Sequence, residues 1–430
     1  MIGKMENKTL RFSVAFGLLF LVLLSISVFT FPHQEQRKAP TSVEFSVPFV
    51  SDPSAFVSIW NTSLISSGSS NSNQVRLPLQ SEGVYNFTVD WGDISTDIIT
   101  TWNQTNVTHT YASAGVYTIT ITGMIEGWWF DYWGTGSDRL KILEIQQWGC
   151  LQLGNSGSYF YKCSNLELTA TDNLNLTGTT NLSEAFGECT NLGSNGNMNG
   201  WDVSNVTDMS FMFYKAATFS QPIGDWDTSS VMTMYAMFAQ ATSFNQPLDN
   251  WNVSRVADMG YMFTEATMFN QSIGVWDVSC VTTMLGMFRG AFTFNQPLDE
   301  WNVSSVTSMW AMFDGANSFN QPIGGWNVSN VTDMSWMFRG VTLSTSNYDN
   351  LLIGWSKLPL KHGVNFDGGT SKYSIHALNA RQSIITNYNW IITDGGLIPG
   401  IAGYNLIVVI AIFGVSIVLG LKRKLLYRDD

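Results

Sequence analysis

Apolar positions recur with a fixed period of 25 residues in the second half of the chain. A valine stands five residues after each tryptophan that marks the period, a methionine stands eight after it, and a Met-Phe pair follows. These tryptophans are Trp201, Trp226, Trp251, Trp276, Trp301 and Trp326. A period of this length indicates supersecondary units that stack, because one unit alone buries too little apolar surface to fold.

Within one period the pattern predicts a short helix and a short strand. The apolar residues of the first turn follow a spacing of three and four, typical of one helix face: Val206, Met209, Met212, Phe213 and Ala216. Ser204 stands at the expected N-cap. The recurring Phe-Asn-Gln-Pro-Ile/Leu segment, as at 244–248, is short and contains proline, so we expect an extended edge there. The expected fold class is an α/β repeat solenoid of the leucine-rich-repeat type, and a pure β-helix is the alternative.

The array of regular turns is expected to span residues 201–344 and to need special ends that cover its apolar faces. Residues 124–200 form the expected N-terminal cap and contain two degenerate copies of the period. The two copies are offset by 26 residues: Phe160, Cys163 and Leu166, then Phe186, Cys189 and Leu192. Residues 345–396 lose the period and show helical spacing from Ala377 to Tyr388, which predicts a C-terminal cap.

An alternating pattern precedes the array, between residues 44 and 123. The run 115–121 alternates and is rich in β-branched residues, which predicts a strand. With Trp-Gly-Asp at 91–93 and His-Thr-Tyr at 109–111, it resembles the PKD family, although Ile94 replaces the last glycine of that family's W-G-D-G turn. The resemblance implies a small all-β sandwich that acts as a spacer or a binding module.

The array itself resembles a second family. The segments WNVSNVTDMSWMF and SFNQPLDNWNVS are similar to the BspA-like leucine-rich-repeat surface proteins, with Met-Phe where that family has Ala-Phe. The resemblance covers residues 160–345. It implies display on the cell surface and adhesion or ligand binding, and it brings no catalytic residues with it.

Both ends of the chain carry uncharged apolar runs. Residues 1–31 begin with basic residues and continue without charge, which indicates a signal peptide or a signal anchor. The run Ile401–Leu421 is long enough to span a bilayer, so 399–421 is the expected transmembrane helix. The basic tail 422–430 follows at once, and the positive-inside rule makes it cytoplasmic. We therefore expect a single-pass protein of the cell membrane with an extracellular N-terminal ectodomain.

The charge and the cysteine content limit which partners the protein can bind and indicate the compartment in which it folds. The formal net charge is −12 and 13% of residues are charged, so the chain has no basic footprint for nucleic acid. Disulfides persist outside the reducing cytosol. Adjacent solenoid turns lie about 5 Å apart, which fits a disulfide, so Cys163 with Cys189 is one candidate bridge and Cys150 with Cys163 the other. Cys280 stands at a variable position and is expected to be a surface thiol.

Catalytic and metal signals are weak. The chain has four histidines and neither a G-x-S-x-G nor an H-E-x-x-H motif, so we expect no enzyme, cofactor or metal. A glycosidase is a remote alternative, because its carboxylate pair leaves no local motif. Asp90, Asp93 and Asp97 are interpreted as solvated turn carboxylates rather than calcium ligands. The Met-Phe and Trp ladders are interpreted as core rather than as a metal site or a sugar platform.

The repeat positions that vary predict where a ligand binds. The residue before each valine changes from turn to turn, and so does the residue after the methionine that stands eight residues beyond each tryptophan, which indicates solvent exposure. Such positions form stripes on a solenoid. The candidate ligand-binding residues are Tyr235, Tyr261, Trp310, Trp336 and Arg255. The expected partner is an extracellular protein or glycan. The alternative is a structural envelope or spacer protein without a specific ligand. For the aromatics one residue nearer the Met-Phe pair, Tyr261 and Trp336, packing between helices is the other interpretation.

Overall fold

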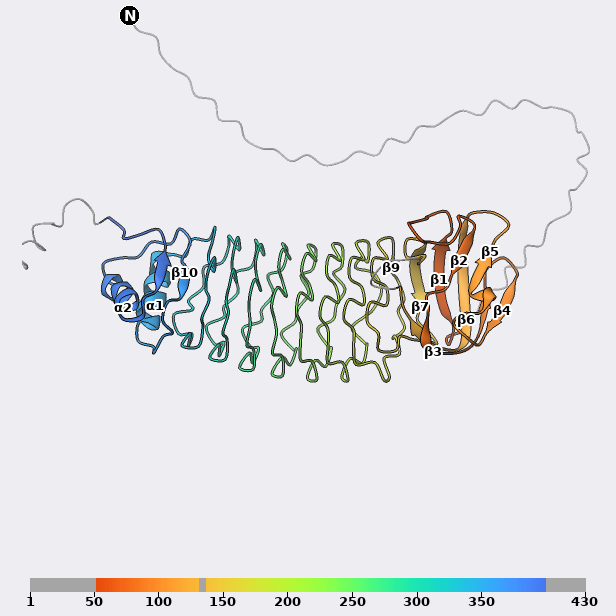
Figure 1. Ribbon diagram of the computed structural model, residues 1–430, viewed down its shortest axis with the longest axis horizontal. Helices are drawn as coiled ribbons and strands as arrows, with labels where there is room; N and C mark the ends of the chain where they lie inside the picture. Colours follow the sequence, from red (N-terminus) through yellow and green to blue (C-terminus); the bar gives the residue numbers. More distant parts are fainter. Residues whose placement is uncertain (1–51, 131–136, 400–430) are drawn as a thin grey trace, which may run out of the picture. The chain divides into compact units, whose positions relative to one another are not determined.

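The computed structural model describes residues 52–130 and 137–399, which fall within one compact unit (Figure 1). The expected signal segment, the apolar run Ile401–Leu421 and the basic tail lie outside the described residues. In the two described ranges, no helix has the length and apolar character needed to cross a bilayer. A β-sheet region comes first, then a stack of turns, then a small cap with two helices.

The N-terminal region is built on a seven-stranded sheet with the order β4-β3-β6-β1-β7-β9, and β8 also pairs with β6. A second sheet pairs β2 with β5. The elements are β1 (Phe56–Asn61), β2 (Gln74–Arg76), β3 (Leu79–Asp90), β4 (Thr96–Ile99), the 3-10 helix η1 (Thr105–Val107), β5 (Thr108–Thr110), β6 (Val116–Trp128), β7 (Ile142–Gln147), β8 (Leu151–Gln152) and β9 (Glu167–Leu168). Burial alternates along β1, as expected for a strand with one face on the core.

The three motifs that suggested a PKD-like sandwich meet in one aromatic cluster. The His109 ring stacks on Trp91 at 4.8 Å, and the Tyr111 hydroxyl donates to the Trp91 carbonyl oxygen at 2.9 Å. Tyr111 also stacks on Tyr117, with ring centroids 3.7 Å apart. Ile94 takes a left-handed conformation with φ of 70°, in a turn that glycine would form without strain.

The three carboxylates of this region serve the local turns. Asp90 accepts from the Gly92 N–H, and Asp97 accepts from the Trp91 indole N–H. Asp93 accepts from Ser95 and contacts the His109 Nε2 at 2.8 Å. In the described ranges, no group of three or more His, Cys, Asp or Glu side chains is arranged to hold a metal ion.

The sheet continues beyond residue 123, where the sequence pattern placed its end. β6 runs on to Trp128, and β7 adds a further strand to the same sheet. β7 pairs in parallel with β9, with Glu144 opposite Glu167, and β9 belongs to the first turn of the stack. Phe160, Phe186 and Phe213 then stack at centroid distances of 5.4 and 5.9 Å, so the degenerate copies carry the core of the array into the sheet.

The regular turns contain no helix in residues 201–344, so the expected helix in each turn is wrong. Neighbouring turns meet at single parallel bridges through Asp208, Thr233, Asp258, Thr283, Ser308 and Asp333. After each bridge the N–H groups alternate: Phe211 donates to Tyr235 in the next turn at 2.8 Å, and Met212 donates back to Met209 at 3.2 Å. Tight turns closed by hydrogen bonds between residues three apart give the same apolar spacing as a helix. For this reason the apolar spacing predicted a helix where the chain forms tight turns.

Two further local expectations are corrected. Ser204 caps no helix, and its hydroxyl donates to the Asp202 carboxylate at 2.6 Å. The Phe-Asn-Gln-Pro-Ile/Leu segment forms no strand, because the residues that bridge the turns lie elsewhere, at the Asp208 position. Residue 202 and its equivalents alternate between Asp and Asn, and each accepts from an N–H two residues on, as the sequence predicted for a local turn.

The core of the array is a set of aromatic ladders, as predicted. Phe263 is fully buried and stacks on Phe238 at 5.6 Å and on Phe288 at 5.8 Å. The tryptophans are buried too, and the Trp251 indole N–H donates to the Ile223 carbonyl of the preceding turn at 2.9 Å. These contacts repeat from turn to turn, so each turn supplies the cover that its neighbour lacks.

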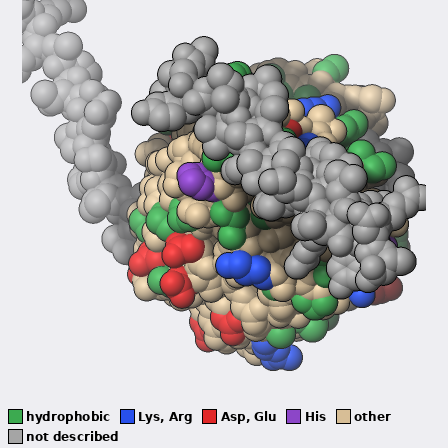
Figure 2. Space-filling view, turned by 90° about the vertical axis from the view of Figure 1, so that its left-hand side faces the viewer, with side chains coloured by type: hydrophobic (Ala, Val, Ile, Leu, Met, Phe, Trp, Pro, Cys, Tyr) green, Lys and Arg blue, Asp and Glu red, His purple; other side chains and the backbone are tan. Residues whose placement is uncertain are grey.

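The C-terminal cap contains α1 (Thr345–Trp355), β10 (Asn365–Asp367), α2 (Leu378–Tyr388) and β11 (Ile391–Thr393). The Ser344 hydroxyl caps α1 by accepting from the Asn347 N–H. Met334 of the last turn bridges to Phe366 of β10, so the cap continues the stack. Figure 2 shows this end of the molecule, where charged side chains of both signs are scattered among polar and apolar ones.

Candidate functional site

Five aromatic side chains from different turns form a continuous row, which we call the aromatic row. It contains Phe211, Tyr235, Tyr261, Trp310 and Trp336. The successive ring centroids lie 5.2, 5.6, 6.5 and 5.3 Å apart, mostly in edge-to-face geometry. Leu285 belongs to the turn between Tyr261 and Trp310. The structure therefore brings together four of the five predicted ligand-binding residues.

The tight turn after each bridge positions these rings. The row draws on two adjacent repeat positions, one occupied by Tyr235 and Trp310 and the next by Phe211, Tyr261 and Trp336. The second position is left-handed in every turn, with φ of 57° at Phe211, 55° at Tyr261 and 62° at Trp336. Other turns have alanine or glycine there. A bulky residue in this conformation costs about 1–3 kcal/mol, so the backbone does not explain the choice of aromatics.

Glycines in the neighbouring turns leave space for the two tyrosines. A Cβ on Gly260 would lie 3.1 Å from the Tyr235 ring. A Cβ on Gly286 would lie 2.6 Å from the Tyr261 ring, closer than real side chains approach. In the row, the large tyrosine rings therefore pack against glycines of the neighbouring turns.

The row is half-buried and ends at its most exposed member. Trp336 is 44% exposed, and the other four rings are partly covered. Burial raises the pKa of the Tyr235 hydroxyl, and the nearby Tyr261 and Asp258 raise it further, so this hydroxyl stays neutral and able to donate. The rings thus offer apolar faces with a few polar groups at their edges.

Charged groups flank the exposed end. The Arg339 guanidinium lies 4.3 Å from the centre of the Trp336 ring, and it pairs with Asp314 at 2.6 Å. Arg289 reaches the same carboxylate at 3.3 Å. A hollow of about 360 Å³ adjoins this end, lined by Ser335, Trp336, Asn365, Phe366, Asp367, Ile391 and Thr393.

Arg255, the fifth predicted residue, stands apart from the row. It is exposed, four residues after Trp251. Within the described ranges, no hydrogen bond or ion pair joins it to a row residue. The charges beside the row come instead from Asp314, Arg289 and Arg339, which the variable-position argument did not select.

The four cysteines are free thiols in the structure. Cys163 and Cys189 are buried at equivalent positions of adjacent turns, and burial raises the pKa of both thiols. The Cys189 Sγ donates to the Phe160 carbonyl at 2.9 Å. Cys150 is half-buried, and Cys280 is exposed as expected. Both candidate disulfides remain predictions.

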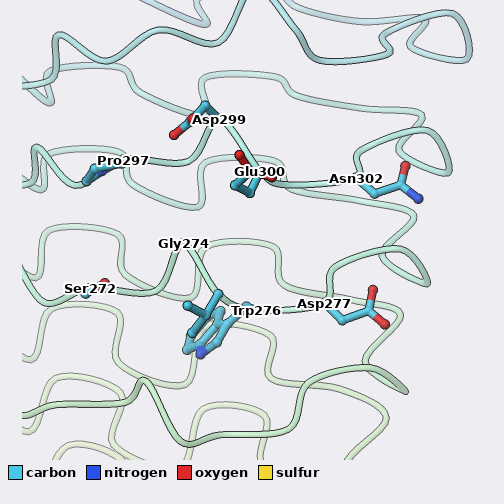
Figure 3. A pocket seen from close by; sticks show the side chains of 9 residues that line it. Ser272, Gly274, Trp276, Asp277, Pro297, Asp299, Glu300 and Asn302 are labelled. Atoms are coloured by element: carbon cyan, nitrogen blue, oxygen red, sulfur yellow. The ribbon is translucent and has the colours of Figure 1, made fainter.

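A second hollow of about 410 Å³ lies between two regular turns (Figure 3). Its lining includes Asp299 and Glu300 on one turn and Trp276 and Asp277 on the turn before it. Gly274 has no side chain to fill this space. The sequence contains a pattern that indicates such a space, which the sequence analysis did not use. Ile-Gly and Leu-Asp alternate before successive tryptophans, which gives the edge a two-turn period.

The repeat region is similar to one known protein family. A family model described as "Mycoplasma protein of unknown function, DUF285" matches residues 152–276 and 246–351. None of the curated proteins or solved structures matches this chain. The match names neither the BspA-like nor the PKD family, so those resemblances stay predictions. The matched residues coincide with the stacked turns and their periodic Phe and Trp ladders, so this repeat region is similar to tandem copies of the DUF285 family.

Proposed function

We propose that the protein is displayed on the cell surface, anchored by its C-terminal apolar run, and that it binds an extracellular glycan or protein through the aromatic row. The terminal sequence patterns support export and anchoring. The sequence has neither a G-x-S-x-G nor an H-E-x-x-H motif, and this supports a binding protein.

The observation that carries this proposal is the choice of aromatic residues at Phe211, Tyr261 and Trp336. Each holds a left-handed backbone that alanine or glycine holds in other turns. The side chains are only partly buried, so core packing does not account for them. Flat rings with polar edges provide contact area at low entropic cost, which suits sugar faces and peptide side chains.

A structural spacer is the second candidate. The edge-to-face pairs of the row, such as Tyr235 with Tyr261, contribute about 0.5–1.5 kcal/mol each beyond their burial. In a spacer protein, the aromatic row would only stabilise the fold and would bind no ligand. The two candidates differ in what happens when the rings are removed, because a spacer loses stability only and a binding protein also loses its ligand.

The experiment replaces Tyr235, Trp310 and Trp336 together with alanine in the full-length protein. A matched control replaces three exposed apolar residues on other repeat positions, Met232, Met268 and Val275, with alanine. Cells that display the parent, the row variant or the control are then tested for adhesion to immobilised polysaccharides, matrix proteins and other cells.

We expect the row variant to lose at least tenfold in adhesion to any surface that the parent binds, and the control to adhere like the parent. Thermal unfolding must show that the row variant remains folded at the assay temperature. Equal adhesion of parent and row variant would place the binding site elsewhere, and adhesion by none of the three would favour the spacer.

A further inference from the structure

A hollow of about 420 Å³ lies where the N-terminal sheet meets the first turns of the stack. It is lined by Ser66, Ser67, Arg139, Leu140, Lys162, Ser164, Glu188, Thr190 and Lys215. The Asn165 side-chain amide donates to the Leu140 carbonyl at 2.8 Å, which fixes the segment before β7 against the first turn. The lining of this hollow shares no residue with the aromatic row, and the hollow plays no part in the function proposed above.

The lining is cationic although the chain is acidic. The protein has 21 Lys and Arg residues and a formal net charge of −12, yet three of its cations gather here with a single acid. That acid, Glu188, pairs with Lys215 at 3.6 Å. Within the part of the chain that the structure describes, neither Arg139 nor Lys162 forms an ion pair.

A second, independent observation concerns the guanidinium of Arg139, which also lines the hollow. The residue is 7% exposed, and its Nε donates to the Ser137 hydroxyl at 3.1 Å. Its Nη2 is buried and has no hydrogen-bond partner among the described residues. A buried charged group without its full set of partners is costly, so a guanidinium left in this state at the wall of a hollow points to a missing anion.

We propose that this hollow binds an oxyanion, the phosphate, sulfate or carboxylate group of a larger ligand. A guanidinium presents parallel N–H donors that match two oxygens of such a group, and Lys162 supplies a second, flexible positive charge. The hydroxyls of Ser66, Ser67 and Ser164 supply neutral donors around them, whereas the Thr190 hydroxyl already donates to the Ser164 carbonyl oxygen at 3.2 Å. The hollow is larger than one oxyanion, so the rest of the ligand is accommodated beside it.

The test measures anion binding by the full-length protein in a non-ionic detergent, by equilibrium dialysis against radiolabelled phosphate, sulfate or acetate in low chloride. Lys162→Gln removes a cation that forms no ion pair among the described residues and lies 4.9 Å from the centre of the Tyr161 ring, and it spares the buried Arg139. Arg255→Gln is the matched control, because it removes an exposed cation on another part of the turns. Arg139→Gln is a third variant, used only if it folds.

We expect the parent to retain at least one of the three anions, Lys162→Gln to bind it at least tenfold more weakly, and Arg255→Gln to match the parent. The anion retained best identifies the group that the ligand carries. Rising chloride should weaken binding, because salt screens charge pairs. Retention of none of the anions by the parent, or equal retention by the Lys162 and Arg255 variants, would overturn the proposal.

Discussion

Three aromatic residues of the array hold a backbone conformation that their side chains disfavour. Phe211, Tyr261 and Trp336 each have φ near 55–62°, and the equivalent positions elsewhere have alanine or glycine. The strain is sustained because the hydrogen bonds on either side of each residue fix the turn, as with Tyr261 donating to Leu285 at 2.8 Å. Each aromatic residue strains the backbone at a position where alanine or glycine would fit, so its side chain is the reason for its presence there.

The core ladder yields the first residue-scale prediction. Phe263→Asp should lower the free energy of unfolding by several kcal/mol, because it buries a charge between Phe238, Phe269 and Phe288 with no partner. Met268→Asp, at a side chain that is 55% exposed five residues away, should change it by no more than about 0.5 kcal/mol. Urea unfolding of both variants checks the pair, and equal stabilities would mean that the ladder does not carry the core.

At this scale the core could be predicted and the polar ladder could not. The Trp and Phe positions follow directly from a 25-residue apolar period. The Asn-Gln pair also repeats, with Ser220 in place of the first asparagine, but its role depends on the neighbouring turn. The Asn270 side-chain oxygen accepts from the Asn295 N–H at 2.9 Å and from the Gln296 amide at 3.0 Å. Such bonds require the distance between turns, which the sequence alone does not supply.

At the scale of the element, each turn is a chain of tight bends rather than a helix and a strand. The apolar spacing was predicted correctly and its cause was not, because bends closed over three residues and helical turns place apolar side chains alike. The signal that distinguishes them was present in the sequence. Glycine recurs at Gly290, Gly315 and Gly340, one left-handed position inside the supposed helix, and a run of glycines at one repeat position argues against a helix interior.

The two-turn alternation predicts which glycines the stack requires. A Cβ on Gly274 would lie 2.7 Å from the Pro297 carbonyl oxygen of the next turn, so Gly274→Ala should destabilise by about 1–3 kcal/mol through overpacking. A Cβ on Gly325 would have nothing within 4 Å, so Gly325 is the matched control. Gly325→Ala should leave the free energy of unfolding within about 0.5 kcal/mol of the parent. If urea unfolding shows equal effects, the close approach between turns is not a constraint.

At the scale of the whole molecule, the sheet and the stack are joined by hydrogen bonds between strands. Parallel pairing of β7 with β9 and of β6 with β8 leads from the sheet directly into the first turns. The sequence indicated two regions but not this join, because β8 and β9 are only two residues long and carry no periodic signal. The hollow at Arg139 lies at the same join, and no sequence motif predicts it.

Surface display can be tested through the one exposed thiol in the described ranges. Cys280 is exposed on the array, whereas Cys163 and Cys189 are buried. A membrane-impermeant maleimide should therefore label the full-length protein on intact cells, and the label should disappear in Cys280→Ser. Labelling that appears only after the cells are permeabilised would mean that the array does not face outward.

The central claim is that the ligand covers the aromatic row, and hydroxyl-radical footprinting of the parent protein tests it most directly. The full-length protein is oxidised free and bound to the surface that it adheres to best, and the modification of single residues is measured by mass spectrometry. Binding should lower the oxidation of Tyr235, Trp310 and Trp336 at least threefold and leave the exposed Met232 and Met268 unchanged. Unchanged oxidation of the row, with protection at the two methionines or in the N-terminal sheet, would contradict the claim.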